Sequence, residues 1–336
     1  KGFMEYKENS HIKGVIFNQM SPMLYPRMKK LVEEELGIEV FGYVPKVEDC
    51  VIESRHLGLV LPEEIVDLKE RLQKLAGVLE ETLEIDRILA LAENAPDLNA
   101  PESLSQKNSA FDFRLPQKLR IGVAKDEAFC FFYEDNFRLL QEMGAELVEF
   151  SPVHDAHLPK NLDGMLLYGG YPELNGEALE QNESMKTEIA QAVNGGMPCM
   201  AECGGFMYLH ERMEDMDGIS RKTCGVIPGK CFRTPKLTRF GYITLTAGQP
   251  VFGQKAEEIG KIPAHEFHYF DSENCGSDFH AAKPLSKRGW DCIHSTDSLL
   301  AGYPHLYYYG NPGIPKAFLI KCLEYHKMMC PCADKL

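Results

Sequence analysis

The chain has 336 residues, 44% of them hydrophobic and 26% charged, and carries a formal net charge of −14 at pH 7. This length suffices for two domains with substantial cores. The negative charge argues against non-specific nucleic-acid binding. No apolar run approaches the roughly 18 residues of a membrane span, and no charged-then-apolar leader opens the chain. We therefore expect a cytoplasmic protein without membrane contact that acts on small molecules.

The eleven cysteines show no spacing typical of a small disulfide-linked secreted scaffold, so we expect a reducing compartment. Cys330 and Cys332 form a Cys-Pro-Cys pair late in the sequence. This pair has no second pair at zinc-finger spacing. The sequence therefore predicts no metal site.

The first third of the sequence alternates between patterns typical of strands and of helices. We predict strands at 13–18 and 38–44, a helix at 23–36 that ends before Gly37, and amphipathic helices over 62–91. Such alternation is typical of an open α/β sheet, and this part supplies about half of one. The first residue is Lys1, not methionine, so the sequence is expected to begin inside a domain.

Residues 95–117 are rich in Pro, Ser, Asn and Ala and lack periodicity, which predicts a linker. Beyond the linker, strands and helices alternate again. Strands are predicted at 119–124, 145–150, 163–168 and 197–202, with helices at 133–144 and 183–196. This β-α-β order predicts a mostly parallel sheet with helices on both faces, and sites in such sheets lie at the carboxyl ends of the strands.

Cys203 follows the strand that ends in Glu202 and precedes Gly204 and Gly205. A nucleophile between a strand and a helix, with small neighbours, is typical of the strained elbow of G-x-S-x-G enzymes. We expect the N-terminus of the following helix to stabilise a thiolate. The alternative is a buried core cysteine, the commoner fate of a free cysteine. The two glycines favour the nucleophile.

A cysteine that attacks an acyl group needs donors for the developing oxyanion. The turn YGGYPEL contains Gly169 and Gly170 and ends the strand that precedes the Cys203 strand in sequence. The backbone N–H groups near these two glycines, together with that of Gly204, are therefore the predicted oxyanion hole. Taken alone, Gly-Gly-Tyr-Pro indicates only a tight turn.

The nucleophile also needs a base. His305 follows an apolar segment and precedes a Gly-Asn-Pro turn, where a loop at the end of the sheet is expected. His265 and His268, in the segment AHEFHYF, are competing candidates. Any one of these histidines can instead be structural.

Four motifs occur in a fixed order: LLYGGYPEL, AECGGFMYL, AHEFHYF and HLYYYGNP. Together they resemble the glutamine amidotransferase domain of the cobyrinic acid a,c-diamide synthase family. The segments GVIFNQM, FGYVPK and ESRHLGLVLPEE resemble the end of that family's ATP-binding domain. The resemblance implies an α/β protein. A partial P-loop domain similar to dethiobiotin synthetase comes first, and an open, mostly parallel sheet of the class I glutamine amidotransferase type follows.

The resemblance also assigns roles to residues. It implies that Cys203 is the glutaminase nucleophile and that His305 activates it. Related amidotransferases carry a carboxylate two residues after this histidine, and this family often has a second histidine there, whereas this chain has Tyr307. We therefore expect a Cys203–His305 dyad. Glu266 is a candidate carboxylate from another segment.

In the first part of the chain, the resemblance places Asn18 and Pro45 near the adenine of ATP. It implies ATP and Mg²⁺ as cofactors of the synthase, with none required for the glutaminase chemistry. The sequence contains no G-x-x-x-x-G-K-[ST] loop to hold phosphates. We therefore expect 1–94 to be the later part of the ATP-binding domain, 95–117 a linker and 118–336 the glutaminase domain.

The resulting hypothesis is ATP-dependent, glutamine-hydrolysing amidation of the a and c side-chain carboxylates of cobyrinic acid in cobalamin biosynthesis, with the glutaminase half in this chain. The expected partners are glutamine and cobyrinic acid or a related tetrapyrrole, with no nucleic acid and no membrane. A monomer and a homodimer both stay open. Two alternatives are a nickel-sirohydrochlorin a,c-diamide synthase and a non-catalytic tetrapyrrole-binding module. Six basic residues could meet substrate carboxylates or form a solvated face: Arg221, Lys222, Lys230, Arg233, Lys236 and Arg239.

Overall fold

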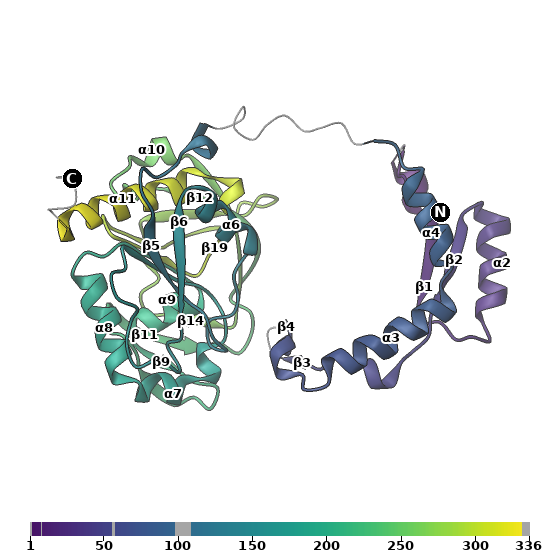
Figure 1. The fold of residues 1–336 in the computed structure, drawn as a ribbon, viewed down its shortest axis with the longest axis horizontal. Helices are drawn as coiled ribbons and strands as arrows, with labels where there is room; N and C mark the ends of the chain where they lie inside the picture. Colours follow the sequence, from purple (N-terminus) through teal and green to yellow (C-terminus); the bar gives the residue numbers. More distant parts are fainter. Residues whose placement is uncertain (1, 8, 56–57, 98–108, 331–336) are drawn as a thin grey trace. The chain divides into compact units, whose positions relative to one another are not determined.

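A computed structural model describes residues 2–7, 9–55, 58–97 and 109–330. The chain divides into two units, Lys1–Pro101 and Glu102–Leu336 (Figure 1). The predicted linker at 95–117 contains this division, and its residues 98–108 lie outside the described residues. Lys1, His56 and Cys332 also lie outside the described residues.

The first unit is built on two parallel strands, β1 (Gly14–Asn18) and β2 (Glu39–Val44). Its helices are α1 (Gly2–Tyr6), α2 (Tyr25–Leu36), α3 (Leu68–Thr82) and α4 (Ile85–Glu93). Strand β3 (Ser54–Arg55) pairs antiparallel with β4 (Gly58–Leu59). Gly37 ends α2 with φ of 65°, and its N–H donates to the carbonyl of Glu33. A left-handed residue after a helix favours glycine, so the predicted stop is confirmed.

The second unit is organised around a six-stranded sheet in the order β17-β18-β8-β7-β5-β6. All of its strands are parallel except β17, which is an antiparallel edge. The strands are β5 (Leu119–Ala124), β6 (Ala145–Phe150), β7 (Gly164–Leu167), β8 (Cys199–Glu202), β17 (His294–Ser295) and β18 (Leu299–Gly302). Every residue of β7, β8 and β18 is buried, as expected for strands covered on both faces. The predicted mostly parallel sheet is confirmed.

Helices cover this sheet on both sides (Figure 1). They include α6 (Glu134–Glu142), α7 (Gly176–Gln181), α8 (Glu183–Asn194), α9 (Gly204–Leu209), α10 (Ala256–Ile259) and α11 (Gly313–Met329). Because side chains alternate along a strand, Leu166 and Met200 pack in one core with α6, while Leu167 and Ala201 pack in the other with α8 and α9. Among the described residues, no helix is long and apolar enough to cross a membrane.

Two further sheets extend the second unit. The five-stranded sheet β16-β15-β12-β13-β19 is antiparallel. Its strands are β12 (Arg239–Ala247), β13 (Lys261–His268), β15 (Phe279–Ala282), β16 (Gly289–Cys292) and β19 (His305–Leu306). The four-stranded sheet β10-β9-β11-β14 contains β9 (His210–Glu214), β10 (Ser220–Lys222), β11 (Ile227–Arg233) and β14 (Phe270–Ser272). The chain enters these sheets after β8 and returns to the central sheet at β17 and β18. Strand β19 follows, and its residue His305 lies beside Glu202 at the end of β8.

Candidate active site

Cys203 lies on a strained turn between β8 and α9. Its φ is 48° and its ψ is −104°, a conformation that side-chain-bearing residues rarely adopt. Its N–H donates a hydrogen bond of 2.9 Å to the carbonyl of Gly302 on β18, and this bond holds the turn in place. A Cβ on Gly205 would lie 2.0 Å from the carbonyl oxygen of Leu167, so only glycine fits beneath the turn. This geometry is that of a nucleophile elbow at the carboxyl end of a central strand.

The Cys203 thiol is buried, with 8% of the residue exposed. Burial raises its pKa well above the usual value, and the carboxyls of Glu173, Glu202 and Glu266 act in the same direction. The N–H of Gly204 donates to the sulfur and lowers the pKa, but this single bond does not offset burial. The expected stabilisation of a thiolate is therefore wrong for the free protein. The resting group is a neutral thiol, which must lose its proton to a base during attack.

His305 lies on β19, where it pairs with His265 of β13. A Cβ added to Gly169 would lie 2.7 Å from His305 Cε1 and 3.5 Å from Cys203 Cβ. The structure therefore brings the imidazole and the nucleophile together across a glycine that leaves room for both. Burial lowers the pKa of His305 to about 4, so the ring is neutral at pH 7. A neutral imidazole is the form that accepts a proton from a thiol.

The three glycines predicted as the oxyanion hole also meet at this point. The N–H of Gly170 lies 3.2 Å from the position that a Cβ on Gly204 would take. The carbonyl of Gly169 accepts a hydrogen bond from the N–H of Phe131 at 3.0 Å, which fixes the turn. The turn thus lies next to the backbone of Gly204, as an oxyanion hole built from these glycines requires.

Asn136 holds the segment that carries His305 in place, although no sequence pattern indicated this residue. This α6 residue is fully buried. Its Nδ2 donates to the carbonyl of Leu306 at 2.8 Å, and its Oδ1 accepts the N–H of Tyr308 at 2.9 Å. A side-chain amide that bonds the backbone on both sides of Tyr307 fixes the strand that carries His305.

Replacing Asn136 with alanine is expected to destabilise the protein by about 1–3 kcal/mol, because two buried backbone groups lose their partners. We also expect kcat for glutamine hydrolysis to fall roughly tenfold, since His305 is no longer held in position. Chemical denaturation and an ammonia assay measure the two effects. Asn182→Ala is the matched control, because Asn182 also donates to backbone carbonyls and accepts a backbone N–H, at the start of α8. Equal losses of kcat in both variants would contradict the assigned role of Asn136.

The structure also shows which groups face the imidazole. The hydroxyl of Tyr307 donates to Asp135 at 3.2 Å and is occupied there. Glu266 is buried with neither carboxyl oxygen hydrogen-bonded within the described part of the chain, and its nearest ion-pair partner is His268 at 4.0 Å. The carboxyl group found beside the ring belongs to Glu202, whose Oε2 lies 3.6 Å from Nδ1 of His305. No sequence pattern indicated Glu202 as the partner of His305.

The competing histidines have other surroundings. His268 is buried, stacks on Tyr303 with ring centroids 4.0 Å apart, and its Nδ1 contacts the carbonyl of Phe270 at 2.6 Å. His265 packs edge-on against Tyr242 at 5.5 Å. These contacts are structural, which leaves His305 as the histidine next to Cys203.

The raised pKa of the Cys203 thiol predicts slow alkylation. Iodoacetamide is expected to modify Cys203 at least about tenfold more slowly than the exposed Cys330 at pH 8, with a rate that still rises at about pH 9. Intact mass and peptide mapping at a series of pH values measure both rates. Faster reaction at Cys203 than at Cys330, with a plateau near neutral pH, would show a thiolate and contradict this account.

In the first unit, Asn18 and Pro45 lie at the same edge of the two-stranded sheet. Asn18 pairs with Val44, and Pro45 follows directly. The side-chain oxygen of Asn18 accepts the N–H of Gln19 at 3.0 Å, directly after the end of β1. The two residues therefore share the carboxyl end of parallel strands, where ligands of α/β sheets bind.

Several of the six basic residues are ion-paired within the fold. Arg221 contacts Asp215 at 2.8 Å and Glu180 at 3.3 Å, and Lys230 contacts Glu214 at 3.3 Å. Arg239 lies 3.8 Å from Asp271. These three side chains balance acidic residues of the chain itself, which favours the structural interpretation for them.

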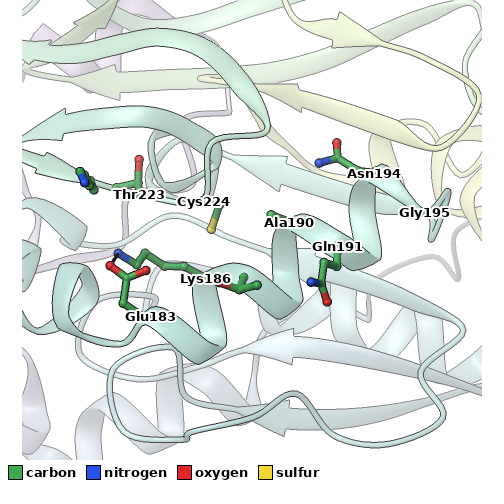
Figure 2. Close-up of a pocket in the computed structure, with 10 residues that line it drawn as sticks. Glu183, Lys186, Ala190, Gln191, Asn194, Gly195, Thr223 and Cys224 are labelled. Atoms are coloured by element: carbon green, nitrogen blue, oxygen red, sulfur yellow. Dashed lines mark hydrogen bonds and ion pairs between the residues drawn. The ribbon is translucent and has the colours of Figure 1, made fainter.

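A surface pocket of about 560 Å³ lies beside α8 and the end of β10 (Figure 2). At its wall, Nζ of Lys186 donates to Glu183 at 3.2 Å and to the carbonyl of Glu180 at 2.6 Å. Lys222, one of the six basic residues, lines this pocket, whereas none of the candidate catalytic or nucleotide-binding residues does. Within residues 2–7, 9–55, 58–97 and 109–330, no group of three or more His, Cys, Asp or Glu residues could hold a metal ion.

Known proteins with similar sequences point to one family. The profile of the CobB/CobQ-like glutamine amidotransferase domain matches residues 120–312. The cobyrinate a,c-diamide synthase of Caldanaerobacter subterraneus subsp. tengcongensis is 35% identical over 96% of this chain and 70% of that protein. The protein of the same name from Dehalococcoides mccartyi is 35% identical over 95% of this chain and 69% of its own length. Among solved structures, PurLQS from Thermotoga maritima aligns with 62% of this chain and 99% of that chain, with 17% identity and a TM-score of 0.43. The chain belongs to the CobB/CobQ-like family of glutamine amidotransferases, the family that its motifs resemble.

Proposed function

We propose that this chain hydrolyses glutamine at Cys203 and that the released ammonia amidates the a and c acetate carboxylates of cobyrinic acid. The observation that carries the glutaminase half is the strained Cys203 elbow with a neutral His305 beside it across Gly169. The names of relatives that match nearly the whole chain support the acceptor. Those names also favour cobyrinate over the nickel-sirohydrochlorin alternative.

The proposed reaction begins with the neutral thiol. As the sulfur of Cys203 attacks the glutamine carboxamide carbon, His305 accepts the thiol proton, and the N–H groups of Gly170 and Gly204 bind the oxyanion. The imidazolium then gives its proton to the leaving nitrogen, so that the C–N bond breaks and ammonia departs. His305 next takes a proton from the water that attacks the thioester. The C–S bond then breaks, the imidazolium returns the proton to the sulfur of Cys203, and glutamate leaves.

We further propose that the first unit is part of an ATP-binding domain. Asn18 and Pro45 fit the base side of a nucleotide site, because they lie together at the carboxyl ends of β1 and β2. ATP, with Mg²⁺, would supply the phosphoryl group that activates a carboxylate toward ammonia. The sequence given has no G-x-x-x-x-G-K-[ST] loop to bind the phosphates.

Isotope transfer tests the proposal. In the natural protein that carries this sequence, glutamine labelled with ¹⁵N at the amide should yield cobyrinic acid a,c-diamide labelled at both amides, in the presence of ATP and Mg²⁺. The label should be lost in Cys203→Ala, whereas free ¹⁵N-ammonia should still label the product. Labelled ammonia release without label in cobyrinic acid would retain the glutaminase and refute the acceptor.

A further inference from the structure

Resting on the proposed glutaminase function, we propose that Glu202 is the positioning residue of His305. The carboxyl group that completes a Cys-His-Glu arrangement is then supplied by the residue directly before the nucleophile, not by a residue after the histidine. This assignment answers what orients the imidazole, given that the sequence has Tyr307 where related amidotransferases carry a carboxylate.

The contacts of Glu202 carry this inference. Glu202 is the last residue of β8 and only 5% exposed. Its Oε2 lies 3.6 Å from Nδ1 of His305, and its carboxyl group accepts a hydrogen bond from the backbone N–H of Leu306. Its Oε1 is buried and has no hydrogen-bond partner among the described residues. The carboxyl group is thus fixed to the backbone beside His305 and faces its ring.

Alternation along β8 explains how adjacent residues reach the histidine from two directions. Successive side chains of a strand point to opposite faces, so Glu202 enters the core that contains Tyr168 and Tyr308. Cys203 follows on the turn, whose positive φ redirects its side chain. Nδ1 of His305 faces Glu202, so the proposed arrangement leaves Nε2 for the thiol.

This arrangement has a chemical consequence. A proton on Nδ1 directed at Glu202 leaves the lone pair on Nε2, which is the tautomer that can accept the thiol proton. Burial raises the pKa of the Glu202 carboxyl well above its usual value. Formation of the imidazolium next to it favours the ionised carboxylate, which then stabilises the positive charge. A separation of 3.6 Å is longer than a hydrogen bond, and catalytic hydrogen bonds are often long before substrate binds.

The other titratable groups around Glu202 are neutral near pH 7. Tyr133, Tyr168 and Tyr308 all have pKa values raised by burial and stay neutral near pH 7. The Cys203 thiol is likewise neutral at rest. Within the described part of the chain, Glu202 is thus the one acidic group that the structure places in ion-pair contact with His305.

The decisive variant is Glu202→Gln. Glutamine keeps the volume and an oxygen that accepts the N–H of Leu306, so a structural role survives. We expect kcat for glutamine hydrolysis to fall roughly 10²- to 10⁴-fold with KM nearly unchanged, because the wrong tautomer is favoured. Glu202→Asp should recover part of kcat.

Glu266→Gln is the matched control. It also removes a buried carboxyl group that raises the pKa of Cys203, but neither carboxyl oxygen of Glu266 has a hydrogen-bond partner among the described residues. We expect its kcat to stay within about twofold of the wild type. Wild-type kcat in folded Glu202→Gln would overturn the inference. Failure of the wild type itself to hydrolyse glutamine would instead refute the proposed function.

Discussion

Cys203→Ala is expected to lower kcat for glutamine hydrolysis by roughly 10⁴-fold or more, because no thioester can form without the sulfur. Alanine removes one atom from a buried site, and the turn is held by backbone contacts to Gly302 and by the close approach of Gly205 to Leu167. The fold should therefore persist. Ammonia release from glutamine measures activity, and circular dichroism with thermal unfolding reports the fold.

Cys199→Ala is the matched control for this variant. Cys199 begins the same strand, is fully buried and is also a free cysteine. Its replacement should lower stability through lost packing, by about 1–2 kcal/mol, and leave kcat per folded molecule unchanged. If Cys203→Ala kept its activity, or if Cys199→Ala lost it while folded, the nucleophile would not be Cys203.

His305→Ala is expected to lower kcat roughly 10²- to 10⁴-fold, which is the usual contribution of a general base. The effect should be large because burial keeps Cys203 a neutral thiol that cannot attack without losing its proton. Added imidazole should restore part of the rate, since the substitution leaves a space of the ring's shape next to Gly169. Ammonia release with and without imidazole measures both effects.

His280→Ala serves as the control for the histidine variant. His280 lies on β15 with its side chain 58% exposed and pairs with Asp291. Its loss should leave kcat unchanged, as expected for a surface ion pair. A His305→Ala enzyme with wild-type kcat would assign the base to another residue.

The parallel core of the second unit could be predicted from sequence because its signals are local. Its strands are short apolar runs that alternate with helical patterns, and the predicted strands at 119–124 and 145–150 match the structure. The four-stranded and five-stranded sheets of the second unit were not predicted. Their strands pair segments far apart in sequence, as in β13 with β19, and such register is set by tertiary packing.

Some residues of the candidate site could likewise be predicted from the sequence, and others could not. Cys203, Gly204 and Gly205 are consecutive, so their pattern alone indicates the elbow. Asn136 acts on residues about 170 positions later, a contact that no local pattern contains. Glu202 is adjacent to Cys203 in sequence, yet its contact with His305 exists only because β19 returns beside β8.

The electrostatic expectation failed for a physical reason. A helix N-terminus favours a thiolate, and the N–H of Gly204 does donate to the sulfur of Cys203. The helix α9 has only six residues and the thiol is buried beneath it. Desolvation of the charged form therefore outweighs the local donors. The burial of a single side chain depends on the whole fold, which the sequence pattern does not give.

The most direct test of a glutaminase site at Cys203 is the intact mass of the protein after exposure to 6-diazo-5-oxo-norleucine, with the modified peptide mapped. The account predicts a single adduct on Cys203 that prior incubation with glutamine prevents and that forms more slowly in His305→Ala. An adduct on another residue, or none on Cys203 in the folded protein, would contradict it.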